Sequence, residues 1–399
     1  FGITVEGGKA DFGAVIKRSR GVADGMSKGI QFLFKKNKID AIMGNGMLKK
    51  DKKIEVTAAD GTKTTYEADH IIIATGARSK ELPGIAIDKK NIIGYREAMS
   101  LPTMPESMVV IGAGAIGVEF AYFYHTMGTK VTVVEFMENG LVPREDAEIS
   151  KELNKIYKKK GMTILGNTAV EKVDISGTKK KVTVKDRKTG ESQVIECDVV
   201  LSATGVTPNL ENIGLEEVGI SIEKGFIKVD EFYNTSVKGY YAIGDVLPTQ
   251  ALAHLASAEG ITCVEKIAGQ HVQPIDYGNV PGCTYCSPEV ASVGYTEVAA
   301  KEAGYELKIG KFPFAASGKA AAGGVKDGFV KLIFDAKYGE LLGAHFIGDN
   351  VTEMIAEIVV ARKLETTGHE MIKSIHPHPT MSEAIMEAAA AAYGEVIHI

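Results

Sequence analysis

A histidine near the C-terminus lies between two prolines, at the point where a helix is predicted to begin. In the segment "IHPHPTMSE", Pro377 and Pro379 flank His378. Proline fixes its own φ at about −65° and disfavours helical backbone in the residue before it, so extended backbone is predicted at His378. Thr380 and Glu383 then have the spacing of a capping box, in which the glutamate reaches back over the helix start. This reach would bring the Glu383 carboxylate to the imidazole.

An imidazole beside a carboxylate can transfer protons. The carboxylate fixes the tautomer of the ring, raises its basicity and stabilises the imidazolium once it has formed. His378 and Glu383 are therefore candidates for a catalytic acid–base pair. The residues alone leave a second interpretation open, a plain capping box beside a surface histidine. His376 has no acid five residues further on, and we predict that it is structural.

A glycine-rich segment, "VVIGAGAIGVEF" (109–120), is predicted to bind a dinucleotide. It follows a predicted strand and opens a helix, which is the setting in which a G-x-G-x-x-G motif is informative. Gly112 would make the tight turn, Gly114 would let the backbone approach the pyrophosphate, and Gly117 would allow the helix to pack closely on the strand. The N–H groups at the helix start, around Ile116, would hold the phosphates.

An acid, Glu135, ends the next predicted strand, 23 residues after Gly112. Its carboxylate could accept hydrogen bonds from both ribose hydroxyls and would repel a 2′-phosphate. None of the residues directly after it is the arginine that an NADP site would need. The motif therefore predicts NAD rather than NADP. The alternative is a glycine-rich turn that binds no ligand.

The composition is that of an ordinary globular protein. The 399 residues indicate about two to three domains, and 45% of them are hydrophobic. The formal net charge of −5 argues against nucleic acid or an acidic membrane as the main partner. No stretch of about 18 uncharged apolar residues is present to cross a membrane. Four cysteines fit a reducing compartment such as the cytoplasm.

Two segments repeat one pattern, an apolar strand that enters an Ala-Thr-Gly turn. They are "DHIIIATGA" (69–77) and "DVVLSATGV" (198–206), and each follows a predicted hairpin segment. Two related nucleotide-binding units explain this repeat best. A basic amphipathic helix is predicted at 12–37. The C-terminal part has the pattern of a separate α+β domain, with strands at 289–295, 329–334 and 341–347 and helices at 351–364 and 380–393.

The predicted fold class is therefore α/β, with two Rossmann-like nucleotide-binding domains and a C-terminal α+β domain. The proline-rich segment "LPTMPESM" is interpreted as a linker between the first two. The expected boundaries are 1–102 for the first nucleotide-binding domain, 103–231 for the NAD-binding domain, 232–278 for a segment that returns to the first domain, and 279–399 for the C-terminal domain.

A Gly-Asp turn follows a predicted strand in "YYAIGDV". Asp245, directly after Gly244, could accept hydrogen bonds from a sugar-like hydroxyl, or it could cap a helix. The helix predicted in "LAHLASAEGITCVEKIAG" (252–269) has an N-terminal dipole that could stabilise negative charge on a ring system. His254 by itself fits packing better than catalysis.

The order of these motifs resembles the pyridine nucleotide–disulfide oxidoreductases. It runs "ATG", "GAGAIGVEF", "ATGVTPN", "YYAIGD", "LAHLASAEG", "PEVASVG" and "HPHPTMSE" over essentially the whole chain, and within the family it is most similar to the dihydrolipoamide dehydrogenases. The resemblance implies FAD and NAD as cofactors, with Asp245 on the ribityl chain of FAD. It also implies cofactor contacts at Thr75, Gly76, Gly205, Leu252, Ala253 and His254.

In this family the acid–base pair is the histidine and glutamate that match His378 and Glu383. The histidine takes a proton from a substrate thiol, the thiolate attacks an enzyme disulfide, and electrons pass through FAD to NAD⁺. The family builds the site across a twofold dimer, so the resemblance implies a homodimer with the C-terminal domain as its interface. It further implies two partners, the lipoyl domain and the E2 subunit of 2-oxoacid dehydrogenase complexes.

Two parts of the family pattern are absent from the sequence, a first G-x-G-x-x-G motif and a C-x₄-C redox pair. We therefore expect a chain that is N-terminally incomplete, binds FAD poorly and is inactive as it stands. The expected location is the cytoplasm, or the mitochondrial matrix if a transit peptide preceded Phe1.

Cys283, Cys286 and Glu119 are the remaining residues considered for a site. Cys283 and Cys286 form a C-x-x-C pair without a second pair to complete a zinc site, and we interpret them as incidental free thiols. Glu119 resembles a family glutamate that pairs with a lysine near the flavin; the alternative is a first-turn acid favoured by the helix dipole.

Two other functions compete with this interpretation. A related glutathione or mercuric reductase usually prefers NADPH, so Glu135 counts against it. A non-catalytic NAD-binding scaffold fits the missing cysteines, but it would have no use for a paired His378 and Glu383.

Overall fold

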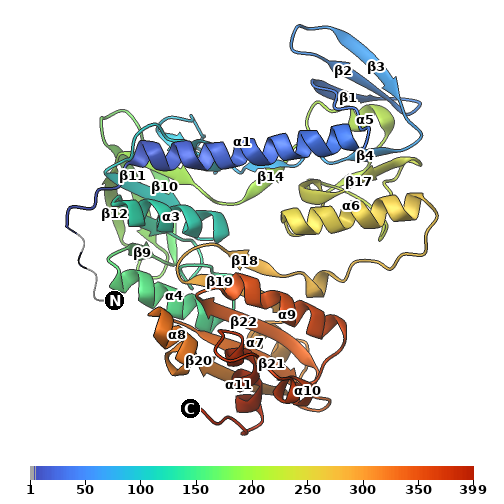
Figure 1. Ribbon diagram of the computed structural model, residues 1–399. Helices are drawn as coiled ribbons and strands as arrows, with labels where there is room; N and C mark the ends of the chain where they lie inside the picture. The colour runs from blue at the N-terminus through green and yellow to red at the C-terminus, as the bar shows by residue number, and fades with distance from the viewer. Residues whose placement is uncertain (1–3, 5) are drawn as a thin grey trace. The chain divides into compact units, whose positions relative to one another are not determined.

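The computed structural model describes residue 4 and residues 6–399, and contacts divide the chain into two compact units. Figure 1 shows the helices and strands of both. The first unit is made of the described residues up to Ile16, Lys80–Gly205 and Tyr277–Ile399. The second unit is made of Lys17–Ser79 and Val206–Asp276.

The first unit contains a five-stranded parallel sheet with the order β6–β13–β7–β8–β9. The chain runs from β7 through α3, β8 and α4 to β9 on one side, then returns to β13 on the other side of β7. The strand order therefore reverses at β7, and in open α/β sheets ligands bind at the carboxyl ends of the strands beside such a point. The elements are β6 (Ile92–Ile93), β7 (Ser107–Ile111), α3 (Ala115–Met127), β8 (Lys130–Val134), α4 (Ala147–Lys159), β9 (Thr163–Leu165) and β13 (Val199–Ser202).

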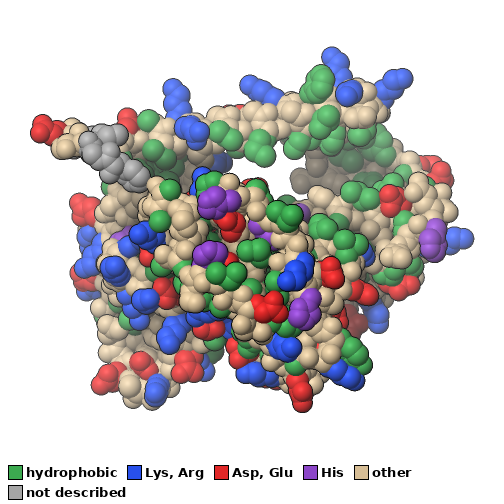
Figure 2. Space-filling model, turned by 60° about the horizontal axis from the view of Figure 1, so that its bottom comes forward, with side chains coloured by type: hydrophobic (Ala, Val, Ile, Leu, Met, Phe, Trp, Pro, Cys, Tyr) green, Lys and Arg blue, Asp and Glu red, His purple; other side chains and the backbone are tan. Residues whose placement is uncertain are grey.

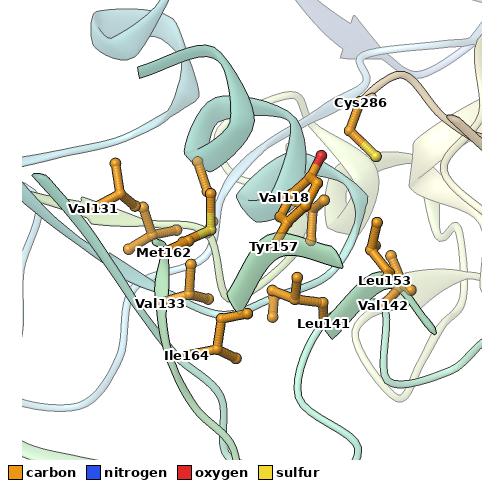
Figure 3. Packing of buried hydrophobic residues seen from close by; sticks show 14 of the residues in the cluster. Val118, Val131, Val133, Leu141, Val142, Leu153, Tyr157, Met162, Ile164 and Cys286 are labelled. Atoms are coloured by element: carbon orange, nitrogen blue, oxygen red, sulfur yellow. The ribbon is translucent and has the colours of Figure 1, made fainter. Parts of the chain in front are cut away.

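The core of this unit lies between the sheet and its helices. Val118 of α3, Val133 of β8 and Leu153 of α4 are fully buried in one cluster (Figure 3). Burying one such side chain contributes about 1.5–3 kcal/mol to folding. The Tyr124 hydroxyl is also buried, and it donates a hydrogen bond of 2.6 Å to the carbonyl oxygen of Ala98. Apolar runs on the strands thus fix α3, which carries the glycine-rich motif at its start.

A three-stranded antiparallel meander follows β9. Its strands are β10 (Thr168–Asp174), β11 (Lys180–Asp186) and β12 (Ser192–Cys197). The predicted second hairpin is confirmed, and its last strand leads directly into β13.

The C-terminal sheet of the first unit is antiparallel, with the order β18–β19–β22–β21–β20. Helix α11 packs on β20 and β21, and α9 packs on β19 and β22. The predicted strands and helices are confirmed, except that the last helix begins at Glu383 instead of residue 380. The elements are β18 (Gly282–Thr284), β19 (Glu289–Gly294), β20 (Leu307–Pro313), β21 (Phe329–Asp335), β22 (Leu341–Gly348), α9 (Val351–Lys363), α10 (Gly368–Lys373) and α11 (Glu383–Ala392).

Strand β20 is not predicted by the sequence pattern. Gly310 interrupts the apolar pattern of this strand, whose sequence is "LKIGKFP". The glycine is required by packing, because a Cβ there would lie 1.8 Å from the carbonyl oxygen of Ala388 in α11. Gly310 therefore weakens the sequence pattern of a strand, and its lack of a side chain is also what allows α11 to pack closely on β20.

The second unit contains short sheets and two long helices. The strand pair β4–β17 is parallel, β5–β14 is antiparallel, and β1, β2 and β3 form an antiparallel meander. The hairpin segment predicted before "DHIIIATGA" is confirmed, with its turn at Asp60–Gly61 between β2 and β3, and the predicted basic helix is confirmed as α1. The elements are α1 (Phe12–Lys36), β1 (Asn45–Lys49), β2 (Lys53–Thr57), β3 (Lys63–Glu67), β4 (Ile71–Ile73), β5 (Ala77–Ser79), β14 (Val206–Pro208), β17 (Tyr240–Ala242) and α6 (Ala253–Ile267).

The division of the chain differs from the boundaries expected at 102/103 and 231/232. The units divide at Lys80 and Val206, because β6 pairs with β13 of the parallel sheet and residues from 206 onward pack in the second unit. The prolines of 101–108 lie within the first unit, where they connect its elements.

None of the helices in the part of the chain that the structure describes is both long and apolar enough to cross a membrane. The longest of them, α1, is interrupted by lysines and arginines along its 25 residues. Figure 2 shows acidic and basic side chains interspersed over one face of the molecule.

Candidate active site

The glycine-rich turn lies at the carboxyl end of β7, beside the point where the strand order reverses. Gly112 has φ +96°, and a Cβ there would lie 2.5 Å from the carbonyl oxygen of Ala203. A Cβ on Gly117 would lie 2.0 Å from the carbonyl oxygen of Gly112. Gly114 has no atom within 4 Å of its Cβ position. The first and third glycines are thus required by packing, while the second leaves space for a ligand to approach.

Helix α3 presents its N-terminus at this turn. Gly114 is its N-cap and provides no side-chain cap, and the half-buried Ile116 lies in the first turn. The first N–H groups of a helix have no partner within the helix, so they and the helix dipole favour an anion here. This geometry suits a pyrophosphate.

Glu135 follows β8 directly and holds the glycine-rich turn in place. Its Oε2 accepts a hydrogen bond of 2.7 Å from the N–H of Ala113, and its Oε1 accepts one of 2.8 Å from the N–H of Met137. The carboxylate is buried. Each carboxylate oxygen can accept a second hydrogen bond, so the predicted contact with ribose hydroxyls stays compatible with these bonds.

Replacing Gly117 with alanine should separate the helix from the turn. The new methyl group would meet the Gly112 carbonyl, so we expect a stability loss of about 1–3 kcal/mol and at least tenfold weaker NADH binding. Gly114→Ala is the matched variant, because its methyl group meets only the ligand space. It should weaken NADH binding but change stability by less than about 0.5 kcal/mol. Urea unfolding and NADH fluorescence titration measure both quantities; an unchanged stability in Gly117→Ala would contradict the prediction.

Glu119 lies in the second turn of α3, which begins at Ala115, so the interpretation as a first-turn acid is wrong. Its Oε1 accepts a hydrogen bond of 2.9 Å from the backbone N–H of Tyr285. Burial raises the pKa of the Glu119 carboxyl. The residue connects α3 to the loop after β18, a contact that its position in the sequence does not reveal.

The two Ala-Thr-Gly turns adopt similar backbone conformations. Gly76 has φ +66° and Gly205 has φ +110°, in keeping with the repeat in the sequence. In the second unit, the Thr75 hydroxyl donates a hydrogen bond of 2.7 Å to the carbonyl oxygen of Asn209. In the first unit, the carbonyl oxygen of Gly205 accepts one of 3.0 Å from the N–H of Lys80. The predicted cofactor contacts of these residues remain predictions.

The Gly-Asp turn forms a short 3₁₀ helix, Gly244–Val246, after β17. Its N-cap is Ile243, so the alternative interpretation of Asp245 as a helix N-cap is wrong. The Asp245 side chain is half-buried. The N–H of Gly244 donates a hydrogen bond of 2.6 Å to Oε2 of Glu259, which is fully buried in α6. Glu259 was not among the predicted site residues, although an acid on the apolar face of α6 is a signal that the sequence carries.

Helix α6 begins at Ala253 with Leu252 as its N-cap, as the sequence predicted to within one residue. Leu252 is half-buried, whereas Ala253 is exposed. His254 is also exposed, so its interpretation as a packing residue is wrong. The first helical turn thus leaves its backbone accessible to a ligand.

His378 and Glu383 are in contact, as predicted. His378 Nδ1 lies 2.9 Å from Glu383 Oε1, and Glu383 Oε2 accepts a hydrogen bond of 2.8 Å from the N–H of Thr380. The His378 side chain is 79% exposed. Because α11 begins at Glu383 with Ser382 as N-cap, the glutamate reaches back over the turn before the helix and Thr380 is not the cap residue.

The charge of Glu383 is stabilised by its hydrogen bonds. Burial acts to raise the pKa of its carboxyl, but the N–H of Thr380 and the ring of His378 outweigh burial, so the pKa lies below its usual value. The ionised carboxylate favours the tautomer in which His378 Nδ1–H donates to it, and this leaves Nε2 as the proton acceptor.

His376 has a carboxylate partner that the sequence analysis did not find. Its Nε2 lies 2.9 Å from Oε1 of Glu357 in α9, and its Nδ1 lies 3.1 Å from the carbonyl oxygen of Ser374. The side chain is nearly buried, as expected for a structural residue. A ring that faces two acceptors must donate from both nitrogens, which only the imidazolium can do. The hydrogen bond to Glu357 accordingly raises the pKa of His376, against the opposing effect of burial.

This pair predicts a pH-dependent contribution to stability. A His376 pKa raised in the folded state stabilises the fold fully below the unfolded value of about 6.5, and this contribution is lost as pH rises through the folded value. Glu357→Gln should therefore lower the free energy of unfolding by about 1 kcal/mol near pH 5.5 and by much less near pH 9. Urea titrations at both pH values test this. Glu365→Gln, at an exposed position after α9, is the control, and equal losses at both pH values would contradict the prediction.

All four cysteines of the chain are free. Burial raises the pKa of Cys283 to about 11 and that of Cys286 to about 12, so both are protonated thiols near neutral pH. In Figure 3, Cys286 lies near the Tyr157 hydroxyl at the edge of the apolar cluster. The described residues hold no group of three or more potential metal ligands. Cys286 is thus a buried free thiol and Cys283 a half-buried one.

The fold and these sites define a class of protein: the chain belongs to the pyridine nucleotide-disulphide oxidoreductases. Residues 4–260 match this family, and residues 280–389 match its dimerisation domain. The predicted fold class is thereby confirmed, and the C-terminal α+β domain is the dimerisation domain of the family.

Within this class, the similar relatives are named dihydrolipoyl dehydrogenase. The protein of Rhizobium etli is 47% identical over 414 aligned residues, which cover 100% of this chain and 86% of the relative. That of Zymomonas mobilis is 45% identical, with coverages of 100% and 85%. The crystal structure of LpdA from Mycobacterium tuberculosis is 28% identical with a TM-score of 0.88, covering 96% of this chain and 84% of that one. The flavoprotein disulfide reductase RclA from Escherichia coli, at 24% identity and a TM-score of 0.86 over 96% of this chain and 86% of that one, shares the fold.

Proposed function

We propose that this protein oxidises dihydrolipoyl groups with NAD⁺ as electron acceptor. The observation that carries the proposal is the contact of 2.9 Å between His378 Nδ1 and Glu383 Oε1. A hydrogen bond from Thr380 holds the second carboxylate oxygen, so the pair has a defined geometry. The names of the similar relatives support the same substrate.

The pair can create the thiolate that the reaction needs. With Nδ1–H donating to Glu383, His378 Nε2 accepts the proton of a substrate thiol, and the carboxylate stabilises the imidazolium that results. The thiolate is the nucleophile in thiol–disulfide exchange. The high exposure of His378 suits a substrate that arrives on another protein.

The residues of the glycine-rich turn fit NAD. Gly114 leaves open space at the start of α3, and the buried carboxylate of Glu135 lies at the end of β8, where a ribose would be bound. The half-buried Asp245 carboxylate and the accessible start of α6 fit the sugar-like chain and the ring of FAD. When bound, FAD supplies electron transfer between a thiolate and the nicotinamide.

The residues of this chain match only part of the family pattern for binding FAD and passing electrons to it. The sequence contains one G-x-G-x-x-G motif and no C-x₄-C pair. We therefore expect the 399-residue chain alone to bind FAD weakly and not to turn over dihydrolipoamide. Absorbance at visible wavelengths tests this directly, since purified chain that is yellow with stoichiometric flavin would contradict the expectation.

The partners and location follow from the same proposal. The dimerisation domain supports a homodimer, and the family arrangement would place His378 at the site of the other subunit. The lipoyl domain and the E2 subunit of 2-oxoacid dehydrogenase complexes would supply the substrate. Such complexes would place the protein in the cytoplasm or, in a mitochondrial setting, in the matrix.

Steady-state kinetics of the full-length, flavin-loaded protein test the function. We expect turnover of dihydrolipoamide with NAD⁺ and little with NADP⁺. NADPH-dependent reduction of glutathione disulfide or mercuric ion would favour a related reductase instead. NADH binding without reduction of any of these acceptors would favour the non-catalytic scaffold.

A further inference from the structure

A cavity lies at the edge of the parallel sheet, where α4 packs against the edge strand β9. Its volume is about 470 Å³, which is within the range of pockets that hold small ligands. One wall is formed by α4 and the other by the segment 138–140 after β8, and Ile164 of β9 and Gly166 also line it. Its described lining contains neither Glu135 nor any residue of the glycine-rich turn. The cavity is therefore separate from the proposed NAD site.

Hydrogen bonds and close packing fix the wall of the cavity. Oδ1 of Asn154, in α4, accepts a hydrogen bond of 3.2 Å from the N–H of Leu141. Its Nδ2 donates one of 2.7 Å to the carbonyl oxygen of Asn139. Gly140, between them, has φ +71°, and a Cβ there would lie 2.5 Å from Oδ1 of Asn154. The loop is thus held against the helix on both sides of the glycine, and the cavity is formed before a ligand arrives.

Three lysines of α4 line this cavity. Lys151, Lys155 and Lys158 are four and three residues apart, which places them along one face of the helix. Lys155 pairs with Glu152 at 3.0 Å, whereas Lys151 and Lys158 form no ion pair with any described residue. Glu138 is the one acid in the described lining. The cavity therefore has an excess of positive charge, which favours an anionic ligand.

The positions of the lysines indicate what kind of anion would fit. The helix dipole stabilises cations in the last turn, and this alone explains Lys158. Lys151 and Lys155 lie further back in α4, where the effect of the dipole has largely fallen off. From the first to the last of these lysines the helix rises about 10 Å. That distance exceeds the size of one phosphate group and suits a chain of linked phosphates.

We propose that this cavity binds a small polyphosphate, either an inorganic chain or the phosphate groups of a nucleotide. Lysine ammonium groups bind phosphate oxygens as point charges. The main-chain N–H groups of Asn139 and Gly140 form no hydrogen bond with any described residue, so they are available as further donors. The proposal does not depend on the proposed oxidoreductase activity, because the two sites share no described residue.

Calorimetric titration of the purified chain with inorganic triphosphate tests the site. Lys151→Gln and Lys158→Gln should each weaken binding roughly fivefold, while Glu138→Gln should strengthen it about twofold. Lys159→Gln is the matched control, because it removes the same charge from an exposed residue that does not line the cavity, and it should change the affinity by less than about twofold. Gly114→Ala fills the ligand space at the glycine-rich turn and should bind triphosphate as the wild type does.

Two further ligands identify the source of the phosphates, and both are titrated into Gly114→Ala. Tighter binding of ADP than of pyrophosphate would support the site with a nucleotide as its ligand. Equal binding of the two would support it with an inorganic polyphosphate.

Three results would overturn the proposal. The first is that triphosphate, pyrophosphate and ADP all fail to bind at millimolar concentration. The second is a loss in Lys159→Gln as large as that in Lys151→Gln, which would mean that the ligand responds only to general surface charge. The third is loss of triphosphate binding in Gly114→Ala, which would place the ligand at the glycine-rich turn. Turnover of dihydrolipoamide enters none of these measurements, so failure of this site and failure of the proposed function are distinguishable.

Discussion

Replacing His378 with glutamine in the full-length, flavin-loaded protein should lower dihydrolipoamide oxidation by a factor of about 10²–10⁴. Glutamine can still donate a hydrogen bond to Glu383, but it cannot accept the proton of a substrate thiol. The substrate then enters the exchange step as a thiol, which is a poor nucleophile. Steady-state assays with dihydrolipoamide and NAD⁺ measure the loss.

The same variant supplies its own control. Reduction of an artificial dye by NADH requires nucleotide and flavin but no substrate thiol, so it should persist in His378→Gln. Glu383→Gln should show a smaller loss, because the amide oxygen could still orient the ring but would not stabilise the imidazolium as a carboxylate does. Equal loss of both activities in His378→Gln would mean that the substitution damages the fold or the cofactor sites, and it would remove the case for an acid–base role.

Features that depend on neighbours in the sequence could be predicted. Gly112 and Gly117 are five residues apart at a strand–helix junction, and their tight contact follows from the geometry of that junction. His378 and Glu383 are also five residues apart, and two prolines restrict the backbone around the histidine. Even here the cap residue was misplaced, because the N-cap is Ser382, two residues after the Thr380 that the capping-box spacing indicates.

Contacts between distant segments could not be predicted in this way. Glu357 reaches His376 from α9, and Arg187 reaches Phe136 from the turn of a meander. Each contact depends on how separate elements pack, and the sequence carries no spacing rule for it. The same holds for Glu259, whose carboxylate holds the Gly-Asp turn from within α6. These residues hold predicted site residues or their near neighbours in place, and their contacts are visible only in the tertiary structure.

A buried ion cluster around Lys331 also depends on contacts between distant segments. Lys331 lies on β21, and its side chain is 1% exposed. Its Nζ lies 2.9 Å from Oδ1 of Asp146, the N-cap of α4, and 2.9 Å from Oε2 of Glu148. The third contact, of 2.8 Å, is with Oε2 of Glu297 in α7 (Glu297–Glu302). An ammonium has three donors, and here all three are used. The cluster thus joins the helix after β8 to the C-terminal sheet.

Substituting Lys331 with methionine should destabilise the protein by about 3–5 kcal/mol. Methionine fills much of the same space, so the cost comes from the carboxylates that lose their counter-charge, above all the buried Asp146. Urea unfolding near pH 7 measures the loss. Lys311→Met is the control, because Lys311 contacts Glu148 from a side chain that is 42% exposed and should contribute less than about 1 kcal/mol.

The pH dependence separates charge from packing in Lys331→Met. Burial acts to raise the pKa of Asp146, but the contact with Lys331, the charge of His345 and the hydrogen bond from the N–H of Glu297 together outweigh burial, so in the wild type the pKa is lowered. The stabilising effect of this lowered pKa is lost as pH falls through the folded value. Without Lys331, burial acts against fewer opposing contacts and the Asp146 pKa should rise. The variant then binds a proton on folding and gains stability as pH falls. The difference in the free energy of unfolding between the wild type and Lys331→Met should therefore become smaller as pH falls from about 7 to about 4. If this difference is the same at both pH values, the loss of stability in Lys331→Met comes from packing, since the volume of methionine does not depend on pH.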